Sequence, residues 1–215
     1  MKLTNEQIEN NYQMFIDLIK DNIKRDGITD LIDWLNSKDT KFAPASTKYH
    51  LSCKGGLVQH SLHVYNRLHR LLETEYGENI PYSEETIVLV SLLHDISKVN
   101  FYTEQIRNVK EYRPDGSKTD SNGRFDWVEE KSYAVKDEQD RFIFGDHSTN
   151  SYYMLNTFIK LTYEEGLAIL HHMGCMEVGS DGLKVKCASE AYKKSTLSLL
   201  LFEADMLATF VDEKE

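Results

Sequence analysis

The stretch LVSLLHDISK, residues 89–98, places ionisable residues directly after an apolar run. The apolar residues 89–93 predict a buried helix, and His94 and Asp95 follow them. Lys98 comes four residues after the histidine and three after the aspartate, so on a helix it lies on their face. Charges in so apolar a segment cost several kcal/mol unless they have a partner, and a metal ion is the usual one. The same His-Asp dipeptide also occurs at ordinary helix ends, so other residues of the chain are needed to distinguish a metal site from a surface pair.

The composition indicates one folded domain covering residues 1–215. Hydrophobic residues make up 40% and aromatic residues 11% of the chain, which is typical of a globular protein. Lys and Arg number 25 against 35 Asp and Glu, so the net charge is −10. This acidity argues against long nucleic acid as a partner. A small anionic substrate is compatible with it, because metal ions and a few lysines can make one site locally positive.

The compartment is indicated by the cysteines and by the apolar runs. Cys53, Cys175 and Cys187 form no close pair, which argues against a disulfide scaffold or a zinc ribbon and fits a reducing environment. Residues 1–12 contain no apolar core and do not resemble a signal peptide. The longest apolar run, residues 197–202, is too short to span a bilayer. We therefore expect a soluble cytoplasmic protein without a membrane partner.

Apolar residues recur at helical spacing through most of the chain. Thr4 and Gln7 predict a capping box for a helix over residues 5–25. Ser83 is expected to cap the helix that carries His94, Asp95 and Lys98. Further helices are expected near residues 31–35, 57–76, 147–160, 163–173 and 189–212.

Residues 103–145 differ from the rest, since they are highly charged and are interrupted by proline and glycine. Short strand-like runs appear at residues 125–128, 133–135 and 142–144. The pattern predicts one or two β-hairpins inserted into a helical protein. Such an insertion serves as a lid or binding loop about as often as it is plain decoration.

Candidate ligands occur on, or at the ends of, several of the expected helices. They are His60, His94, Asp95, His147, His171, His172 and Asp205. Nitrogen and carboxylate ligands without cysteine suit Fe, Mn, Co, Ni or Zn, and also Mg. Asp95, adjacent to a histidine, could bridge two such ions about 3.5–4 Å apart. Asp205 lies on the apolar side of a leucine-rich helix, where a carboxylate is rarely unpaired.

These residues resemble the HD-domain superfamily of metal-dependent phosphohydrolases. The order H…HD…H…H…D, the HDxxK motif at residues 94–98 and the GGLVQHSL segment at residues 55–62 carry the resemblance, which covers residues 54–210. Two further histidine positions make the dinuclear branch the closest in pattern. The GYP tripeptide of one cyclic-dinucleotide group is absent, since Met173 and Gly174 follow the histidines. The resemblance implies an all-α bundle of five or more helices, preceded by N-terminal helices in residues 1–50 and interrupted by the 103–145 insertion.

The resemblance also implies roles for individual residues. A first metal would be held by His60, His94, Asp95 and Asp205. Asp95 would bridge to a second metal held by His147 and by one of His171 or His172. The other of these two histidines, His172 being our catalytic candidate, would bind a phosphate oxygen or donate a proton. Lys98 would neutralise the phosphate as a point charge, and His63, one turn from His60, is a candidate substrate contact.

The expected function is hydrolysis of a phosphoester in a nucleotide or a small phosphorylated metabolite by a metal-bound hydroxide. One or two divalent ions would serve as cofactors. Two alternatives stay open at this point. A few HD-fold proteins are di-iron oxygenases with the same ligand order, although Lys98 favours hydrolysis. A domain that binds a nucleotide as a sensor, without catalysis, is the third hypothesis.

Overall fold

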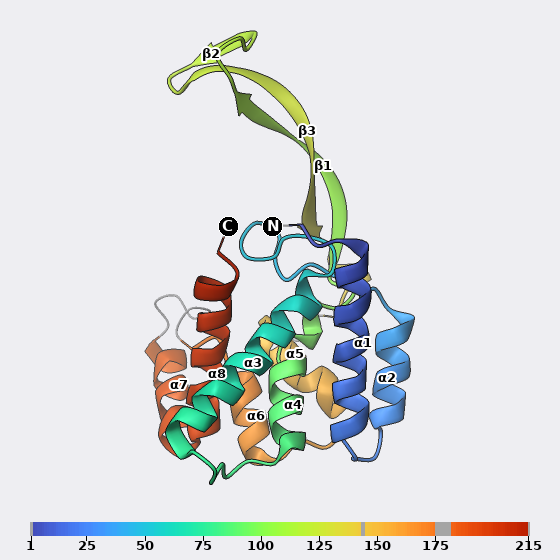
Figure 1. Ribbon diagram of the computed structural model, residues 1–215, viewed down its shortest axis with the longest axis vertical. Coiled ribbons are helices and arrows are strands. Elements are labelled where there is room, and N and C mark those ends of the chain that lie inside the picture. The colour runs from blue at the N-terminus through green and yellow to red at the C-terminus, as the bar shows by residue number, and fades with distance from the viewer. Residues whose placement is uncertain (1, 143–144, 175–181, 215) are drawn as a thin grey trace.

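The computed structural model describes residues 2–142, 145–174 and 182–214. Within these ranges the chain forms a helical body from which a three-stranded antiparallel sheet projects (Figure 1). The helices are α1 (Asn5–Asn22), α2 (Ile28–Ser37), α3 (Gly56–Tyr76), α4 (Glu84–Leu93), α5 (His147–Asn156), α6 (Tyr163–Leu170), α7 (Gly182–Lys194) and α8 (Thr196–Leu207). The fold is therefore mostly helical, and the expectation of an all-α fold is correct for the body only.

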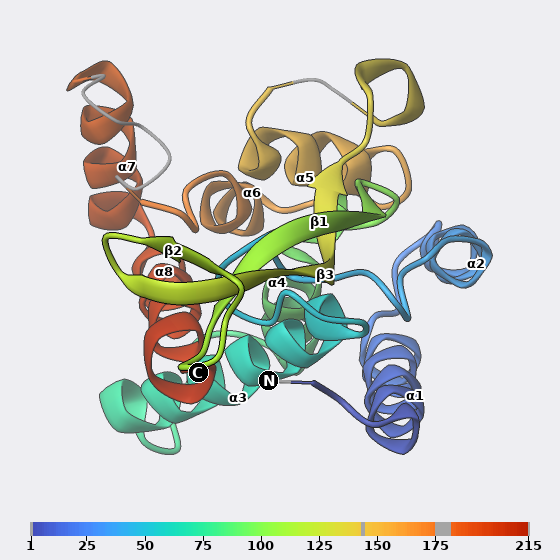
Figure 2. The ribbon, with the colours of Figure 1, turned by 90° about the horizontal axis from the view of Figure 1, so that it is seen from above.

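Helix α4 lies at the centre of the body because it is apolar on every side. All seven residues from Ile87 to Leu93 are buried, which is the pattern of a helix surrounded by others. It contacts α1, α3 and α6, and α3 also packs along α8. Seen from above, α2 and α7 lie at opposite sides of the body (Figure 2). The end of α4 therefore opens into the middle of the protein.

The start of α3 packs closely against the segment before it, which explains the paired glycines. Gly55 adopts a left-handed conformation with a φ of 80°. A side chain at Gly56 would collide with the carbonyl of Leu51. The Leu57 amide also donates to the carbonyl of Ala43 at 2.9 Å. These contacts seat the first turn of α3, which leads directly to His60.

Local signals predicted the early helices well. Thr4 and Gln7 form the expected capping box of α1, and α2 and α3 include the expected ranges 31–35 and 57–76. The prediction for the last helix is wrong. The helix expected over 189–212 is two helices separated by Ser195 in an extended conformation, followed by a π-helical turn at Ala208–Asp212. After this break, the apolar residues Leu197, Leu200 and Leu201 of α8 are buried in the core.

The inserted segment forms a long hairpin, called the arm below. Strand β1 (Tyr102–Tyr112) pairs along its whole length with β3 (Gly123–Val135), and the short β2 (Lys118–Asp120) pairs with the outer end of β3. The predicted runs 125–128 and 133–135 are both parts of β3. The charged strand β1 was not predicted. Phe142 lies in no strand, and the remainder of the run 142–144 falls outside the described residues.

The arm rises from the end of the body at which both termini lie (Figure 1). Its outer part makes its own small cluster, in which Phe125 is buried against Tyr112 and Trp127. Ile106 is 66% exposed, and Trp127 is 49% exposed. The arm is thus an ordered extension, and its role as a lid or as decoration stays a prediction.

A buried ion pair links helices at the start of α4, the end away from His94 and Asp95. Arg25, which follows α1, donates to both oxygens of Glu165 in α6 at 2.6 and 2.7 Å. The Glu165 side chain is fully buried and also accepts from Thr86 of α4 at 2.9 Å. Three helices therefore share one carboxylate.

We predict that Arg25→Met lowers the free energy of unfolding by about 3 kcal/mol, because it leaves the buried carboxylate of Glu165 unpaired. Urea denaturation measures this. Arg113→Met, which removes an exposed ion pair with Asp126 on the arm, should change the free energy of unfolding much less, because solvent screens exposed pairs. Pairing with Arg25 outweighs burial and lowers the pKa of Glu165. Because the pair stabilises the protein only while Glu165 is ionised, the effect of Arg25→Met on the free energy of unfolding should become smaller as the pH falls below about 4. Equal effects of the two variants would contradict the prediction.

Candidate metal centre

Five elements bring their ionisable residues to one place at the end of α4. His60 comes from α3, His147 begins α5, and Asp205 belongs to α8. His94 and Asp95 follow α4, which ends at Leu93. The expected helix through Lys98 is therefore replaced by a 3-10 turn at Ile96–Lys98. His172 follows the end of α6.

The first part of the cluster surrounds one oxygen of Asp95. Asp95 Oδ2 lies 3.4 Å from His94 Nε2 and 3.7 Å from His60 Nε2. His60 Nε2 lies 3.1 Å from Asp205 Oδ1. Ligand atoms of His60, His94 and Asp205 all lie within 4.8 Å of one another. Two nitrogens and two carboxylates thus converge on one point.

The second part of the cluster faces the other oxygen of Asp95. Asp95 Oδ1 lies 3.5 Å from His147 Nε2 and 3.6 Å from His172 Nε2. The two histidine nitrogens are 3.2 Å apart. Asp95 therefore turns one oxygen to each of two sets of ligand atoms, as a bridging carboxylate would.

The backbone determines which nitrogen of two histidines faces the cluster. His94 Nδ1 donates to the carbonyl of Ser91 at 2.8 Å, and His172 Nδ1 donates to that of Ile169 at 2.7 Å. Each ring in its neutral form then presents the Nε2 lone pair to Asp95. Among the described residues, His94 Nε2 and Asp95 Oδ1 are buried without a hydrogen-bond partner. Unsatisfied buried acceptors that converge in this way fit a divalent cation.

Behind His60 lies a buried carboxylate that the sequence did not reveal. Glu213 is 4% exposed, and His60 Nδ1 donates to its two oxygens at 3.0 and 3.2 Å. The π-helical turn after α8 precedes it directly, and such turns are frequent near functional sites. In the sequence, Glu213 belongs to an acidic chain end that looks the same as a solvated one.

His63 belongs to the same supporting group and not to the open face of the cluster. Its Nδ1 donates to Glu213 at 2.9 Å, and its Nε2 accepts from Gln59 at 2.6 Å. Gln59 in turn accepts from Asn11 of α1 at 2.6 Å. Because both ring nitrogens are engaged, the predicted substrate contact of His63 finds no support in this geometry.

The two candidate histidines after α6 lie in different surroundings. His172 is fully buried beside Asp95. His171 is half-buried at the helix end, where burial lowers the pKa of its ring and Asp146 opposes this. The structure therefore brings His172 into the cluster and leaves His171 beside it.

The charges of the cluster compensate one another strongly. Burial opposes the charge of Asp95, but Lys98 and His94 outweigh it and hold the pKa of this carboxyl well below its usual range. Lys98 Nζ donates to Asp95 Oδ2 at 2.6 Å. Burial likewise opposes a charge on His60, yet hydrogen bonds to Asp205 and Glu213 raise its pKa to about 10. The centre thus attracts positive charge, as a proton or as a metal ion.

A cleft of 750 Å³ gives access to the cluster. Asp95, Lys98 and Asp205 form its polar floor. Its other lining residues are Lys48, Tyr49, His50, Met173, Met206, Thr209, Phe210 and Glu213. The walls are therefore largely apolar and aromatic.

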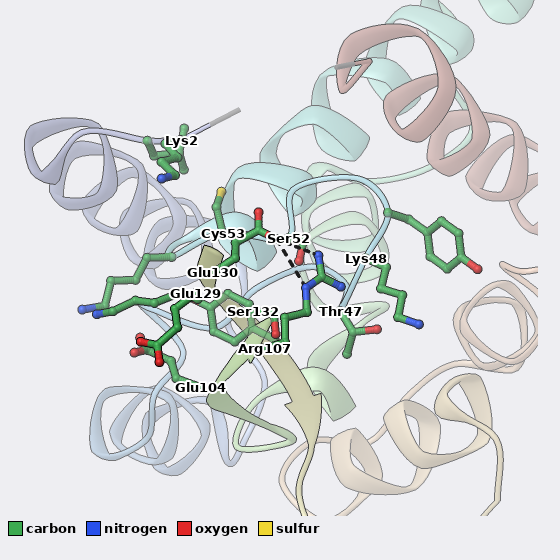
Figure 3. A pocket seen from close by; sticks show the side chains of 15 residues that line it. Lys2, Thr47, Lys48, Ser52, Cys53, Glu104, Arg107, Glu129, Glu130 and Ser132 are labelled. Carbon is green, nitrogen blue, oxygen red and sulfur yellow. Dashed lines mark hydrogen bonds and ion pairs between the residues drawn. The ribbon is translucent and has the colours of Figure 1, made fainter. Parts of the chain in front are cut away.

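A separate cavity of 590 Å³ lies between the base of the arm and the segment 47–54 (Figure 3). Arg107 of β1 and Glu130 of β3, which lie opposite each other in the sheet, form an ion pair at 3.0 Å in its lining. Lys48 and Tyr49 line both this cavity and the cleft. None of the predicted metal ligands is among the described lining residues of this cavity. The cavity is therefore a neighbour of the cleft and is not part of the metal centre.

Comparison with known proteins agrees with this geometry. The family model of the HD domain matches residues 57–209, a range that includes all the histidines and aspartates of the cluster. No curated protein and no solved structure matches the chain. No helix of the described residues is long and apolar enough to cross a membrane. The length of the family match shows that the chain belongs to the HD domain family, whose members are generally metal-dependent phosphohydrolases.

Proposed function

We propose that this protein hydrolyses a phosphoester of a nucleotide or a small phosphorylated metabolite with the help of one or two divalent metal ions. The observation that carries the proposal is the placement of Asp95. Its two oxygens face separate sets of histidine nitrogens, at the floor of a cleft that Lys98 also lines.

The arrangement of donor atoms supports the following assignment of ligands. A first ion would be held by His60, His94, Asp95 Oδ2 and Asp205. A second ion would be held by Asp95 Oδ1, His147 and His172. Fe, Mn, Co, Ni, Zn and Mg are all compatible with such nitrogen and oxygen donors. Bound ions of this kind polarise phosphoryl oxygens and make water a nucleophile near neutral pH.

Lys98 has the position of a phosphate-binding residue. Burial opposes its charge, but Asp95 outweighs burial and raises the pKa of the ammonium above its ordinary value. It therefore stays protonated at neutral pH. Its place in the lining of the cleft supports contact with a phosphate oxygen, which a point charge stabilises.

We assign Glu213 the role of orienting His60, and His172 the role of a metal ligand. Glu213 keeps the Nδ1 proton of His60 and so directs the Nε2 lone pair of that ring at the cluster. His172 donates its Nδ1 proton to a backbone carbonyl, which suits a metal ligand better than the proton donor that the sequence suggested. The wall of the cleft supports a substrate with a flat apolar part, since Tyr49, Phe210 and Met206 offer stacking surfaces for a nucleobase.

The first prediction concerns Asp95→Asn. We expect about two transition-metal ions per chain in anaerobically purified protein and the loss of both in the variant, because one carboxylate serves both parts of the cluster. Elemental analysis measures the metal. Hydrolysis of phosphate mono- and diesters with Mn²⁺, Fe²⁺ or Co²⁺ should fall by at least about 1,000-fold in the variant, because a neutral amide with a single oxygen replaces the carboxylate that serves both parts of the cluster. Glu130→Gln on the arm is the control.

Other outcomes would change the assignment. About one ion per chain would restrict the centre to its first part. Oxygen uptake by iron-loaded protein without hydrolysis would favour a di-iron oxygenase. Nucleotide binding without turnover under every metal would favour a sensor. No metal after reconstitution would refute the proposal.

Glu213→Gln tests the carboxylate behind His60. We expect metal affinity to fall by about 10- to 100-fold, the usual effect of removing a carboxylate behind a ligand histidine. Titration of the metal-free protein with Mn²⁺ measures this. The neighbouring variant Asp212→Asn, which loses only a surface contact with Arg67, should bind metal normally. A similar loss in both variants would indicate a general disturbance of the chain end.

The pKa of His60 predicts that metal binding releases a proton. Without metal, a pKa of about 10 keeps the ring protonated at pH 7, whereas a metal ligand must be neutral. Metal affinity should therefore rise by about tenfold per pH unit between pH 6 and 9. Calorimetry in buffers of different ionisation heat should give about one proton released per first ion. Affinity independent of pH in this range would contradict the ligand role of His60.

A further inference from the structure

A second space adjoins the centre on the side of His147. It has a volume of 300 Å³ and is lined by Lys98, Phe101, Tyr102, Arg141, Asp146 and His147, among others. We call it the Arg141 recess. Lys98 lines both the recess and the cleft, so the two spaces lie on either side of one ammonium group. None of the aromatic or methionine side chains that line the cleft lines the recess.

Arg141 lies in this recess with an unused donor. Its guanidinium carbon stands 5.0 Å from the centre of the Phe101 ring, so an aromatic face holds one side of the group. Its Nε atom is buried and has no hydrogen-bond partner among the described residues. Buried donors in native proteins are almost always satisfied. The unpartnered Nε donor of Arg141 could therefore donate to an anionic group of a bound ligand.

The charges of the recess favour an anion. Lys98 and Arg141 are two fixed positive charges, and the ring of His147 adds a donor or a metal contact. Asp146 is the acid of this lining, and one of its oxygens accepts from the amide of Thr149 at 2.9 Å as the cap of α5. Lys98 is already paired with Asp95, so among the described lining residues Arg141 is the cation with a donor left for a new partner.

We propose that the Arg141 recess binds a second phosphate group of the substrate, and that Arg141 determines specificity for substrates with two phosphates. One phosphate would then lie over Asp95 and Lys98, the second would lie against Arg141, and an apolar part such as a nucleobase would occupy the cleft. The inference rests on the proposed function only in placing the first phosphate at the metal centre. Arginine suits this role because its planar donors match two phosphate oxygens at once.

Three small anions test the recess without any need for turnover. Methylphosphonate carries one phosphonate, methylenediphosphonate carries two that cannot be hydrolysed, and phosphonoacetate replaces the second by a carboxylate. Calorimetry would use protein loaded with Mn²⁺, at equal free Mn²⁺ in cell and syringe. We expect methylenediphosphonate to bind at least tenfold more tightly than methylphosphonate, with phosphonoacetate in between.

Variants assign this preference to one residue. Arg141→Met should reduce the ratio of the two affinities to about one and leave methylphosphonate binding unchanged. Arg141→Lys should keep part of the preference, because it keeps the charge and loses the planar donors. Arg107→Met, an arginine paired with Glu130 on the arm, is the matched control and should behave as the parent protein. Circular dichroism verifies that each variant is folded.

Several results would overturn the inference. These are equal binding of the one- and two-phosphonate probes by the parent protein, no binding of either, equal weakening of both in Arg141→Met, or phosphonoacetate binding as tightly as the diphosphonate. The test separates the two proposals. Phosphoester hydrolysis with a binding ratio of one would refute the recess and keep the proposed function. A ratio above ten that depends on Arg141, in a protein without hydrolysis, would do the opposite.

Discussion

The burial of the Asp95 carboxylate is the constraint on which the rest of the structure depends. The residue is 2% exposed at the end of the most apolar helix, where an uncompensated charge would be very costly. Lys98 compensates one oxygen directly, and four histidine nitrogens surround the two oxygens at 3.4–3.7 Å. Each of these histidines comes from a different helix or helix end. The arrangement of the bundle is therefore also the arrangement of the site.

This compensation links folding to metal binding. Helices α3, α5 and α8 and the segments after α4 and α6 each direct an imidazole or a carboxylate at the same few ångströms of space. Among the described residues, His94 Nε2 and Asp95 Oδ1 are buried there without a hydrogen-bond partner. A cation that satisfies them binds the folded state only, so its binding free energy adds to stability. Arg25 and Glu165 form a second buried ion pair, which links the end of α1 to the first turns of α4 and α6.

Around this centre the protein offers surfaces of different chemistry. The cleft is apolar and aromatic beyond its floor, the Arg141 recess is cationic, and Lys98 separates them. The cavity at the base of the arm has mixed charges, of which Arg107 and Glu130 form an ion pair (Figure 3). Because a phosphate group alone would use only the floor, the two flanking spaces are where discrimination between phosphorylated substrates would arise.

The sequence by itself determined the local helices and the donor chemistry. Capping at Thr4, apolar periodicity and the His-Asp pair depend on neighbours within a few residues, so they can be read along the chain. Only the tertiary structure decided between His171 and His172, since consecutive side chains at a helix end point in different directions and long-range packing selects one. The same holds for Glu213, whose burial depends on a π-helical turn, and for β1, whose charged residues form a strand because β3 pairs with them. The two oxygens of Asp95 face the adjacent His94 and three histidines that are 35–77 residues away in sequence, and this arrangement exists only in the folded chain.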